Sequence, residues 1–165
     1  MTLVAGVPSA QSPARRLVSP DELAALARKA RTVFSHRPVE ALRLPRPVTW
    51  HNDYGDALDA AAGDWLISDS VRVWSCKDDL FQERYEMLPD GRFLKHAPAR
   101  AVQMDAPFEM DTLEGRSGGV AGDWIFFGAP GEAWPVSDRA VVENAYSETP
   151  PVCGWAGPRS GEHRP

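Results

Sequence analysis

An internal repeat is the feature of this chain that most constrains its fold. The string AGDWLI at 62–67 recurs as AGDWIF at 121–126, which is 59 residues later. Aromatic residues that follow the string also recur in pairs, Trp74 with Trp134 and Tyr85 with Tyr146. The spacing grows by one residue at each of these pairs, as insertions in the connecting turns would cause. The repeat therefore predicts two copies of one unit, at 34–88 and 93–148.

Each copy has the same order of short segments. A proline precedes a short strand, a Gly-Asp turn precedes an apolar strand with Trp, and a second turn leads to a partner strand and an amphipathic helix. The matching segments are 39–44 and 99–104, 65–68 and 124–127, 72–76 and 132–136, and 77–86 and 137–146. This order predicts an α+β fold in which each copy is a small antiparallel sheet closed by a helix. Because a unit of about sixty residues buries little apolar surface alone, we expect the copies to share one core.

A helix with a strong start signal precedes the first copy. Ser19 stands at the N-cap position, Pro20 follows it, and Glu22 completes a capping box. Apolar residues then recur with the helical period, so the sequence predicts an added N-terminal helix over 19–34.

The two ends of the chain have the composition of unstructured segments. Residues 1–18 are rich in Ala, Ser and Pro without a period, which predicts a disordered lead-in. Residues 149–165 are rich in Pro, Gly and charge, which predicts a loose tail. The single globular domain is therefore expected to be 19–148.

Charge and composition argue against several classes of function. The net charge of −5 and pI near 5.3 disfavour nucleic-acid binding, which needs a basic face. No apolar run is long enough for a membrane span or has the flanks of a signal peptide, so we expect a cytoplasmic protein with no membrane partner. Cys76 and Cys153 are expected to be unpaired thiols. The four histidines are dispersed without metal-ligand spacing, and no cofactor motif occurs. The oligomeric state is left open.

Further motifs carry a resemblance to a known family. The second copy has TLEG at 112–115, GDWI at 122–125 and GEAWPV at 131–136, and the first has HRPVEA at 36–41, GDWLI at 63–67 and YE at 85–86. These motifs resemble a family of small bacterial and phage-encoded proteins named from their PGDYG or PGDWI motif, although both copies have Ala in place of the motif's Pro. The resemblance covers most of 33–148. It implies the family's fold in tandem duplication, and it implies no catalytic residue.

Four polar residues are candidates for acid–base chemistry. If the copies pack about a pseudo-two-fold axis, Asp64 and Asp123 converge on one cleft and one of the two pKa values rises. His51, in a stretch rich in loop formers, and Glu132 are further candidates. The alternative is that each Asp caps its own turn by accepting hydrogen bonds from backbone N–H groups.

The aromatic residues of the two copies have two interpretations. As binding residues they form a groove that stacks on a ligand, and as structural residues they are cross-strand anchors in the core. The set comprises Trp65, Trp74, Trp124, Trp134, Tyr85 and Tyr146.

The leading hypothesis is a non-catalytic binding or interaction module that presents an aromatic and acidic groove to a small polar ligand or a protein partner. The alternative is a small metal-independent hydrolase or lyase that acts on a nucleotide-like or other polar metabolite.

Overall fold

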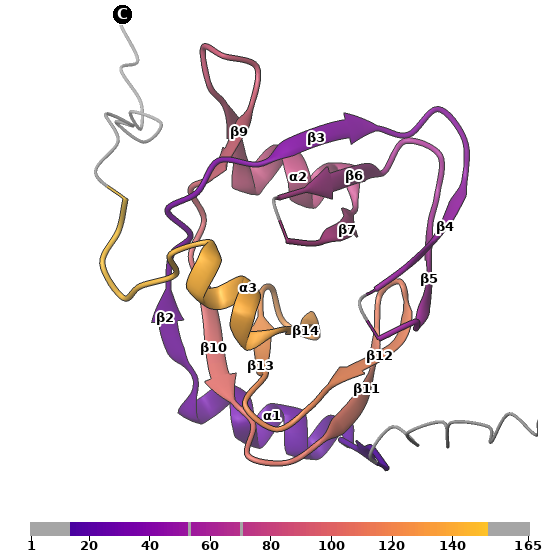
Figure 1. Cartoon of the computed structure of the whole chain (residues 1–165), viewed down its shortest axis with the longest axis vertical. Coiled ribbons are helices and arrows are strands. Elements are labelled where there is room, and N and C mark those ends of the chain that lie inside the picture. The colour runs from indigo at the N-terminus through magenta and orange to yellow at the C-terminus, as the bar shows by residue number, and fades with distance from the viewer. Residues whose placement is uncertain (1–13, 53, 70, 152–165) are drawn as a thin grey trace, which may run out of the picture.

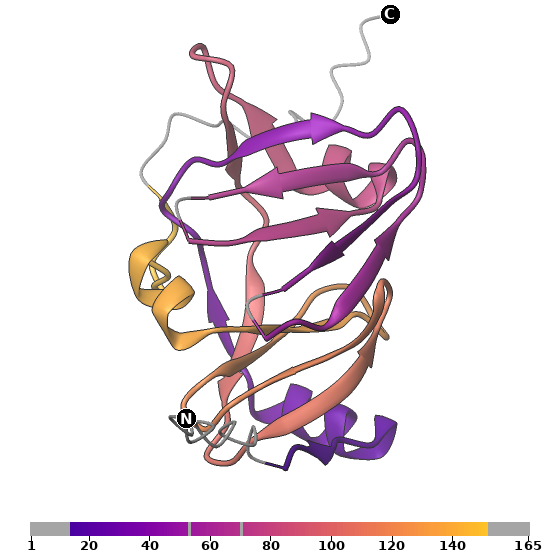
Figure 2. The same cartoon turned by 45° about the vertical axis from the view of Figure 1, so that its right-hand side comes forward.

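The computed structural model of the chain describes residues 14–52, 54–69 and 71–151. The helices and strands in these ranges are β1 Arg16–Leu17, α1 Pro20–Lys29, β2 Arg31–Val33, β3 Glu40–Arg43, β4 Val48–His51, β5 Ala57–Ala60, β6 Trp65–Ser68, β7 Val73–Cys76, α2 Asp78–Arg84, β8 Tyr85–Met87, β9 Phe93–Lys95, β10 Ala99–Gln103, β11 Phe108–Thr112, β12 Gly115–Gly119, β13 Trp124–Phe127, β14 Ala133–Val136 and α3 Asp138–Glu143. Figures 1 and 2 show β3, β6, β7 and α2 at one end of the molecule and α1 at the opposite end. The fold is mixed α and β, with small sheets and short helices.

Two small antiparallel sheets, one in each half of the chain, correspond to each other. The first half of the chain, residues 34–88, has the strand order β3-β6-β7. The second half, residues 93–148, has the order β10-β13-β14, and β2 adds to the free side of β10. The registers correspond, because Trp65 lies opposite Cys76 and Trp124 lies opposite Val136. In each half a hairpin, β4–β5 or β11–β12, connects the first two strands of the sheet, and a helix follows the third.

The Gly-Asp turn has the same backbone geometry in both halves. Gly63 has a φ of 90° and Gly122 a φ of 96°, a region in which a side chain would crowd the backbone. The Gly63 N–H donates to the Leu44 carbonyl, and the Gly122 N–H donates to the Met104 carbonyl, both at 2.8 Å. These bonds hold the start of β6 beside the end of β3, and the start of β13 beside the end of β10.

The buried apolar side chains form three clusters, so the expectation of one shared core is wrong. One cluster lies in the first half around Ile67 and Phe81. The second half has a cluster around Phe126 and another around Phe108 and Ile125, which packs on α1. The physical reason is that aromatic and charged side chains line the region between the halves. Apolar burial therefore takes place mainly within each half.

Ordered structure begins earlier than the sequence predicts. Arg16–Leu17 pairs in parallel with β11, and Val18 is buried in the cluster around Phe108. Residues 14–18 thus do not belong to a disordered lead-in, because backbone pairing and burial fix them. Residues 1–13, and residues 152–165 of the expected tail, lie outside the described residues.

The N-terminal helix is shorter than the predicted 19–34. Ser19 is the N-cap of α1 and forms the reciprocal capping box with Glu22, but α1 ends at Lys29. Ala30 is extended, and Arg31–Val33 continues as β2, which pairs with β10. A β-branched pair within β2 favours a strand once an open sheet edge is available.

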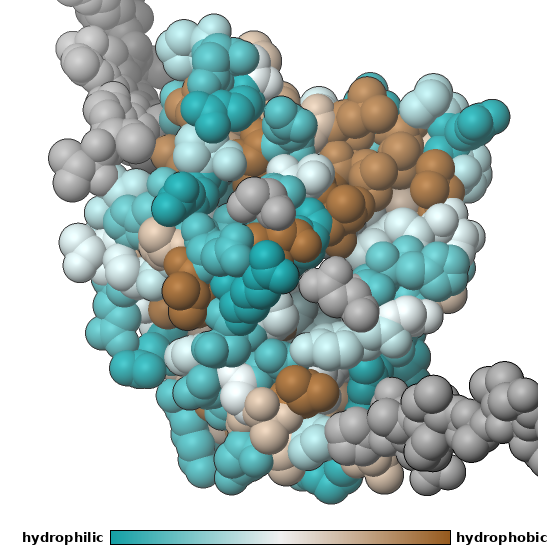
Figure 3. Space-filling view, in the orientation of Figure 1, coloured by the Kyte–Doolittle hydropathy of each residue, from teal (hydrophilic) through white to brown (hydrophobic). Residues whose placement is uncertain are grey.

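Part of the surface is apolar. In the view of Figure 3, the largest brown area lies over the first half, in the region that β3 and β6 occupy in Figure 1. Leu42 of β3 is exposed and belongs to none of the three clusters. Its neighbour Ala41 packs against the cluster around Ile67, as the alternation of side chains along a strand requires. The first sheet therefore turns one face toward solvent.

Candidate functional site

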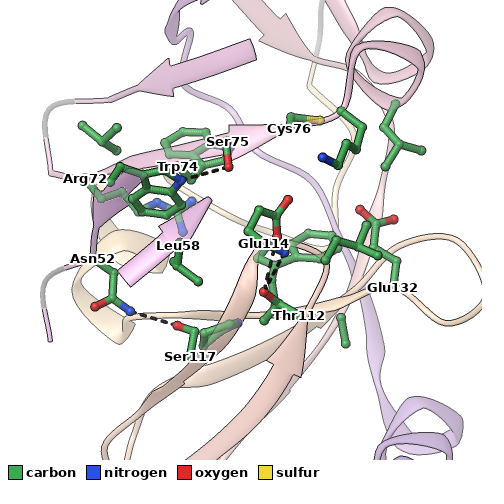
Figure 4. Close-up of a pocket in the computed structure, with 18 of the residues that line it drawn as sticks. Asn52, Leu58, Arg72, Trp74, Ser75, Cys76, Thr112, Glu114, Ser117 and Glu132 are labelled. Atoms are coloured by element: carbon green, nitrogen blue, oxygen red, sulfur yellow. Dashed lines mark hydrogen bonds between the residues drawn. The ribbon is translucent and has the colours of Figure 1, made fainter. Parts of the chain in front are cut away.

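A cavity of about 130 Å³ lies between the two halves. Its walls come from β7 and β14, which are the third strands of the two sheets, and from the hairpins β4–β5, β8–β9 and β11–β12. In Figure 4, Trp74 and Cys76 enter from the first half. Thr112, Glu114 and Glu132 enter from the second half. The cavity is therefore built jointly by residues that are far apart in the sequence.

Most of the aromatic residues proposed from the sequence as ligand contacts line this cavity. Those that do so are Trp74, Trp134, Tyr85 and Tyr146. Trp65 and Trp124 do not line it. Their indole N–H groups donate to carboxylates at the starts of the helices, Trp65 to Asp78 at 2.7 Å and Trp124 to Asp138 at 3.0 Å. These two tryptophans fasten each helix to its sheet.

A buried ion pair forms one side of the cavity. Arg84 ends α2 and is 8% exposed, and its guanidinium donates to both carboxylate oxygens of Glu132 at 2.8 and 2.5 Å. Glu132 also accepts the Ala129 N–H at 3.0 Å. A Cβ at Gly128 would overlap the Glu132 carboxylate, so glycine is required there for this approach. The negative charge of Glu132 is thus satisfied by a bidentate pair across the two halves.

Lys95 lines the cavity without a polar partner. It pairs with Tyr85 across β8–β9, and the residue is only 9% exposed. Its ammonium lies 5.0 Å from the centroid of the Trp134 ring. Within the described ranges, the Lys95 Nζ makes no hydrogen bond and no ion pair. Burial, and after it the positive charge of Arg84, lowers the pKa of Lys95 from 10.5 to about 8.

Other titratable groups of the cavity also have pKa values shifted from their ordinary range. Burial raises the pKa of the Cys76 thiol from 9.0 to about 12 and also raises the pKa of the Tyr85 hydroxyl. Burial raises the pKa of the Glu114 carboxyl above its ordinary 4.5. The Lys77 ammonium donates to Asp64 at 2.8 Å, and this bond raises the pKa of Lys77.

Asp64 and Asp123, the proposed acid–base pair, both hydrogen-bond to their own turns. Asp64 accepts the Ala61 N–H at 2.8 Å, and Asp123 accepts the Val120 N–H at 3.0 Å. Asp123 also accepts the Tyr54 hydroxyl. Both carboxylates are buried, and neither lines the cavity. Their contacts are those of the turn-capping alternative.

The four acid–base candidates are not brought together. Among the described residues, no hydrogen bond joins any two of Asp64, Asp123, His51 and Glu132. His51 is exposed on β4 and lies outside the cavity lining. Glu132 lines the cavity, but Arg84 neutralises it. The described part of the chain also has no group of three or more His, Cys, Asp or Glu side chains placed to hold a metal ion.

Five charged residues of the cavity were missed by the sequence analysis: Arg72, Lys77, Arg84, Lys95 and Glu114. A signal existed for Lys95. It follows Phe93 by two residues in a short strand, so both side chains lie on the same face. Phe93 packs on the cluster around Ile67. A lysine on the inner face of a strand is a sign of a buried charge.

No protein-family model, curated protein or solved structure shows a significant match to this chain. Across the described residues, none of the helices has both the length and the apolar character needed to span a membrane.

Proposed function

We propose that this chain is a binding protein for a small ligand in the cavity between its halves, and that an oxygen atom of the ligand accepts hydrogen bonds from Lys95. The observation that carries the proposal is the Lys95 ammonium, which lines the cavity and has no polar partner among the described residues. Folding desolvates this cation without giving it a protein acceptor, and such desolvation lowers the free energy of unfolding. A ligand that supplies an acceptor explains why the chain places a lysine there.

The size and walls of the cavity define a class of ligand. A volume of about 130 Å³ is close to the roughly 150 Å³ of an apolar cavity that accepts benzene. Trp74 and Trp134 supply flat surfaces, on which a planar ring stacks favourably. The ligand class that fits is therefore one six-membered ring or a molecule of similar size, with one oxygen-bearing group.

The alternative function, acid–base hydrolysis or lyase chemistry, has less support. It needs two of Asp64, Asp123, His51 and Glu132 within reach of one substrate. Only Glu132 lines the cavity, and its carboxylate is bound by Arg84. We also expected an acidic groove. The cavity instead contains a basic side chain, Lys95, that has no ion-pair partner among the described residues. Binding without these groups as catalysts is the better-supported function.

We also propose that the two halves are copies of one ancestral unit of the kind that the PGDYG motif marks. The support is the equal strand order, the equal register at Trp65 and Trp124, and the equal glycine geometry of the two turns. In this interpretation the cavity formed when the two copies packed so that their third strands, β7 and β14, border the same space.

Benzoate tests the binding function, because it has the proposed size and carries a carboxylate. Nitrobenzene has nearly the same shape without the charge and serves as the matched ligand. We expect benzoate at about a hundred times its Kd to raise the free energy of unfolding by about 2.7 kcal/mol in thermal denaturation. By titration calorimetry, nitrobenzene binds roughly tenfold to a hundredfold more weakly, because a charge-assisted hydrogen bond contributes about 1.5–3 kcal/mol.

Variants assign the effect to one side chain. Lys95→Met removes the preference for benzoate over nitrobenzene, whereas Lys29→Met, an exposed lysine on α1, keeps it. The proposal is refuted if benzoate gives no stabilisation of the wild-type chain, or if Lys95→Met and Lys29→Met bind it equally well.

A further inference from the structure

Lys95 is the only described cavity residue that combines an amine with a lowered pKa. The Cys76 thiol has a pKa of about 12 and the Tyr85 hydroxyl also has a raised pKa, so neither forms its anion at neutral pH. Lys77 also lines the cavity, but its ion pair with Asp64 keeps it charged. With a pKa of about 8, roughly one-tenth of the Lys95 amine is neutral at pH 7, against about 0.03% for an ordinary lysine.

We infer that Lys95 forms a reversible imine with small aldehydes and ketones that enter the cavity. The inference rests on the binding function proposed above and specifies that the ligand's oxygen-bearing group is a carbonyl. It is carried by the position of the amine, which belongs to a residue only 9% exposed, keeps accessible surface, lines a cavity with room for a small carbonyl compound, and is held by no polar partner among the described residues.

The reaction is balanced without an external oxidant or reductant. The Nζ lone pair attacks the carbonyl carbon, the C–N bond forms, and the C=O π electrons move to oxygen. Transfer of one proton from nitrogen to this oxygen gives a carbinolamine. Protonation of its hydroxyl, cleavage of the C–O bond and loss of the remaining nitrogen proton then give an imine and one water molecule.

Glu114 is the carboxyl group to which we assign donation of the proton that turns the hydroxyl into a leaving water. Its side chain lines the same cavity, and Figure 4 shows it between Cys76 and Thr112. The Thr112 hydroxyl lies 3.4 Å from a Glu114 carboxylate oxygen and accepts the Glu114 N–H at 3.2 Å, which fixes the residue. Because burial raises its pKa, the Glu114 carboxyl is protonated over a wider pH range than an exposed glutamate.

Reductive trapping tests the inference. The wild-type chain is incubated near pH 7 with benzaldehyde and sodium cyanoborohydride, which reduces an imine to a stable benzylamine, and the modified peptides are mapped by mass spectrometry. The chain has three lysines, Lys29, Lys77 and Lys95, so two of them are internal references. We expect Lys95 to be modified at least about tenfold faster than Lys29, because the larger neutral fraction outweighs the restricted access. Peptide mapping keeps the N-terminal amine separate.

Two further measurements separate the cavity from general reactivity. Benzoate added before the aldehyde slows modification of Lys95 and leaves that of Lys29 unchanged, because it occupies the cavity without forming an imine. Glu114→Gln slows modification of Lys95 several-fold relative to Lys29. Modification of Lys95 no faster than that of Lys29 overturns the imine, and if benzoate still stabilises the chain the binding function stands. If benzoate also fails to stabilise it, both proposals are refuted.

Discussion

The unpartnered ammonium of Lys95 leads to a prediction about stability: we expect Lys95→Met to stabilise the protein at neutral pH. Methionine has a flexible apolar side chain of similar length, so it fills the same space without a charge. The pKa of Lys95 falls from an ordinary 10.5 to about 8 in the folded protein. Each pKa unit corresponds to about 1.4 kcal/mol, so the buried charge lowers the free energy of unfolding by about 3 kcal/mol, and the variant avoids this loss.

The predicted stabilisation has a definite pH window. Below pH 8 the amine is charged in the folded and unfolded states, so the difference between variant and wild type is at its full value. Between pH 8 and 10.5 the unfolded state holds the proton more tightly than the folded state, so the stability of the wild type rises with pH. Above pH 10.5 the amine is neutral in both states and the difference disappears. Urea denaturation of both proteins at about pH 7, 9 and 11 measures this change.

Lys77→Met is the matched control, because it makes the same substitution at a lysine whose pKa is raised by its bond to Asp64. We expect this variant to be less stable than the wild type at neutral pH. The reasoning about Lys95 is refuted if Lys95→Met destabilises the protein as Lys77→Met does. It is refuted equally by a stabilisation that stays constant from neutral pH to above 10.5.

Two other predictions concern the same cavity. Glu132→Gln leaves the buried Arg84 without its carboxylate and is expected to lower the free energy of unfolding by about 3–5 kcal/mol. Asp111→Asn, in an exposed pair, is expected to change it by less than about 1 kcal/mol. Urea denaturation of both variants tests the contrast. Cys76 is expected to react slowly with iodoacetamide in the native protein near pH 8 and quickly in urea, because its thiol has a pKa of about 12 only when buried. Peptide mapping measures both rates, and equal rates in the native protein and in urea contradict this prediction.

The sequence predicts the strands best where local pattern and turn chemistry agree. Trp65–Ser68 and Trp124–Phe127 form at their predicted positions, because a Gly-Asp turn fixes the start of each apolar run. The segment at 115–119, GRSGG, has little strand propensity, yet it forms β12. There the backbone of β11 lies so close that a Cβ at Gly118 would overlap the Phe108 carbonyl. Such a strand is determined by its partner and not by its own residues.

The cavity illustrates a second limit of sequence reasoning. Trp74 and Trp134 are large aromatic residues in a repeated pattern, and the pattern alone selects them. Arg84 and Lys95 have the appearance of solvated surface charges in the sequence, because a charged residue is usually exposed. Only the packing of one half on the other shows that both are buried. Charges at an interface between repeats are thus harder to predict than the apolar residues within each repeat.

The two halves differ at the cavity, and this difference bears on function. Trp74 and Trp134 occupy matching positions in β7 and β14, and each has a cation over its ring: Arg72 at 4.5 Å and Lys95 at 5.0 Å. Arg72 pairs with Asp69 at 3.3 Å, whereas Lys95 has no such partner within the described ranges. The cation over Trp74 has a carboxylate partner within the protein. The cation over Trp134 has none among the described residues, so a ligand can supply its hydrogen-bond acceptor. The scaffold of the cavity is therefore nearly symmetric, while its binding chemistry lies on the side of Lys95.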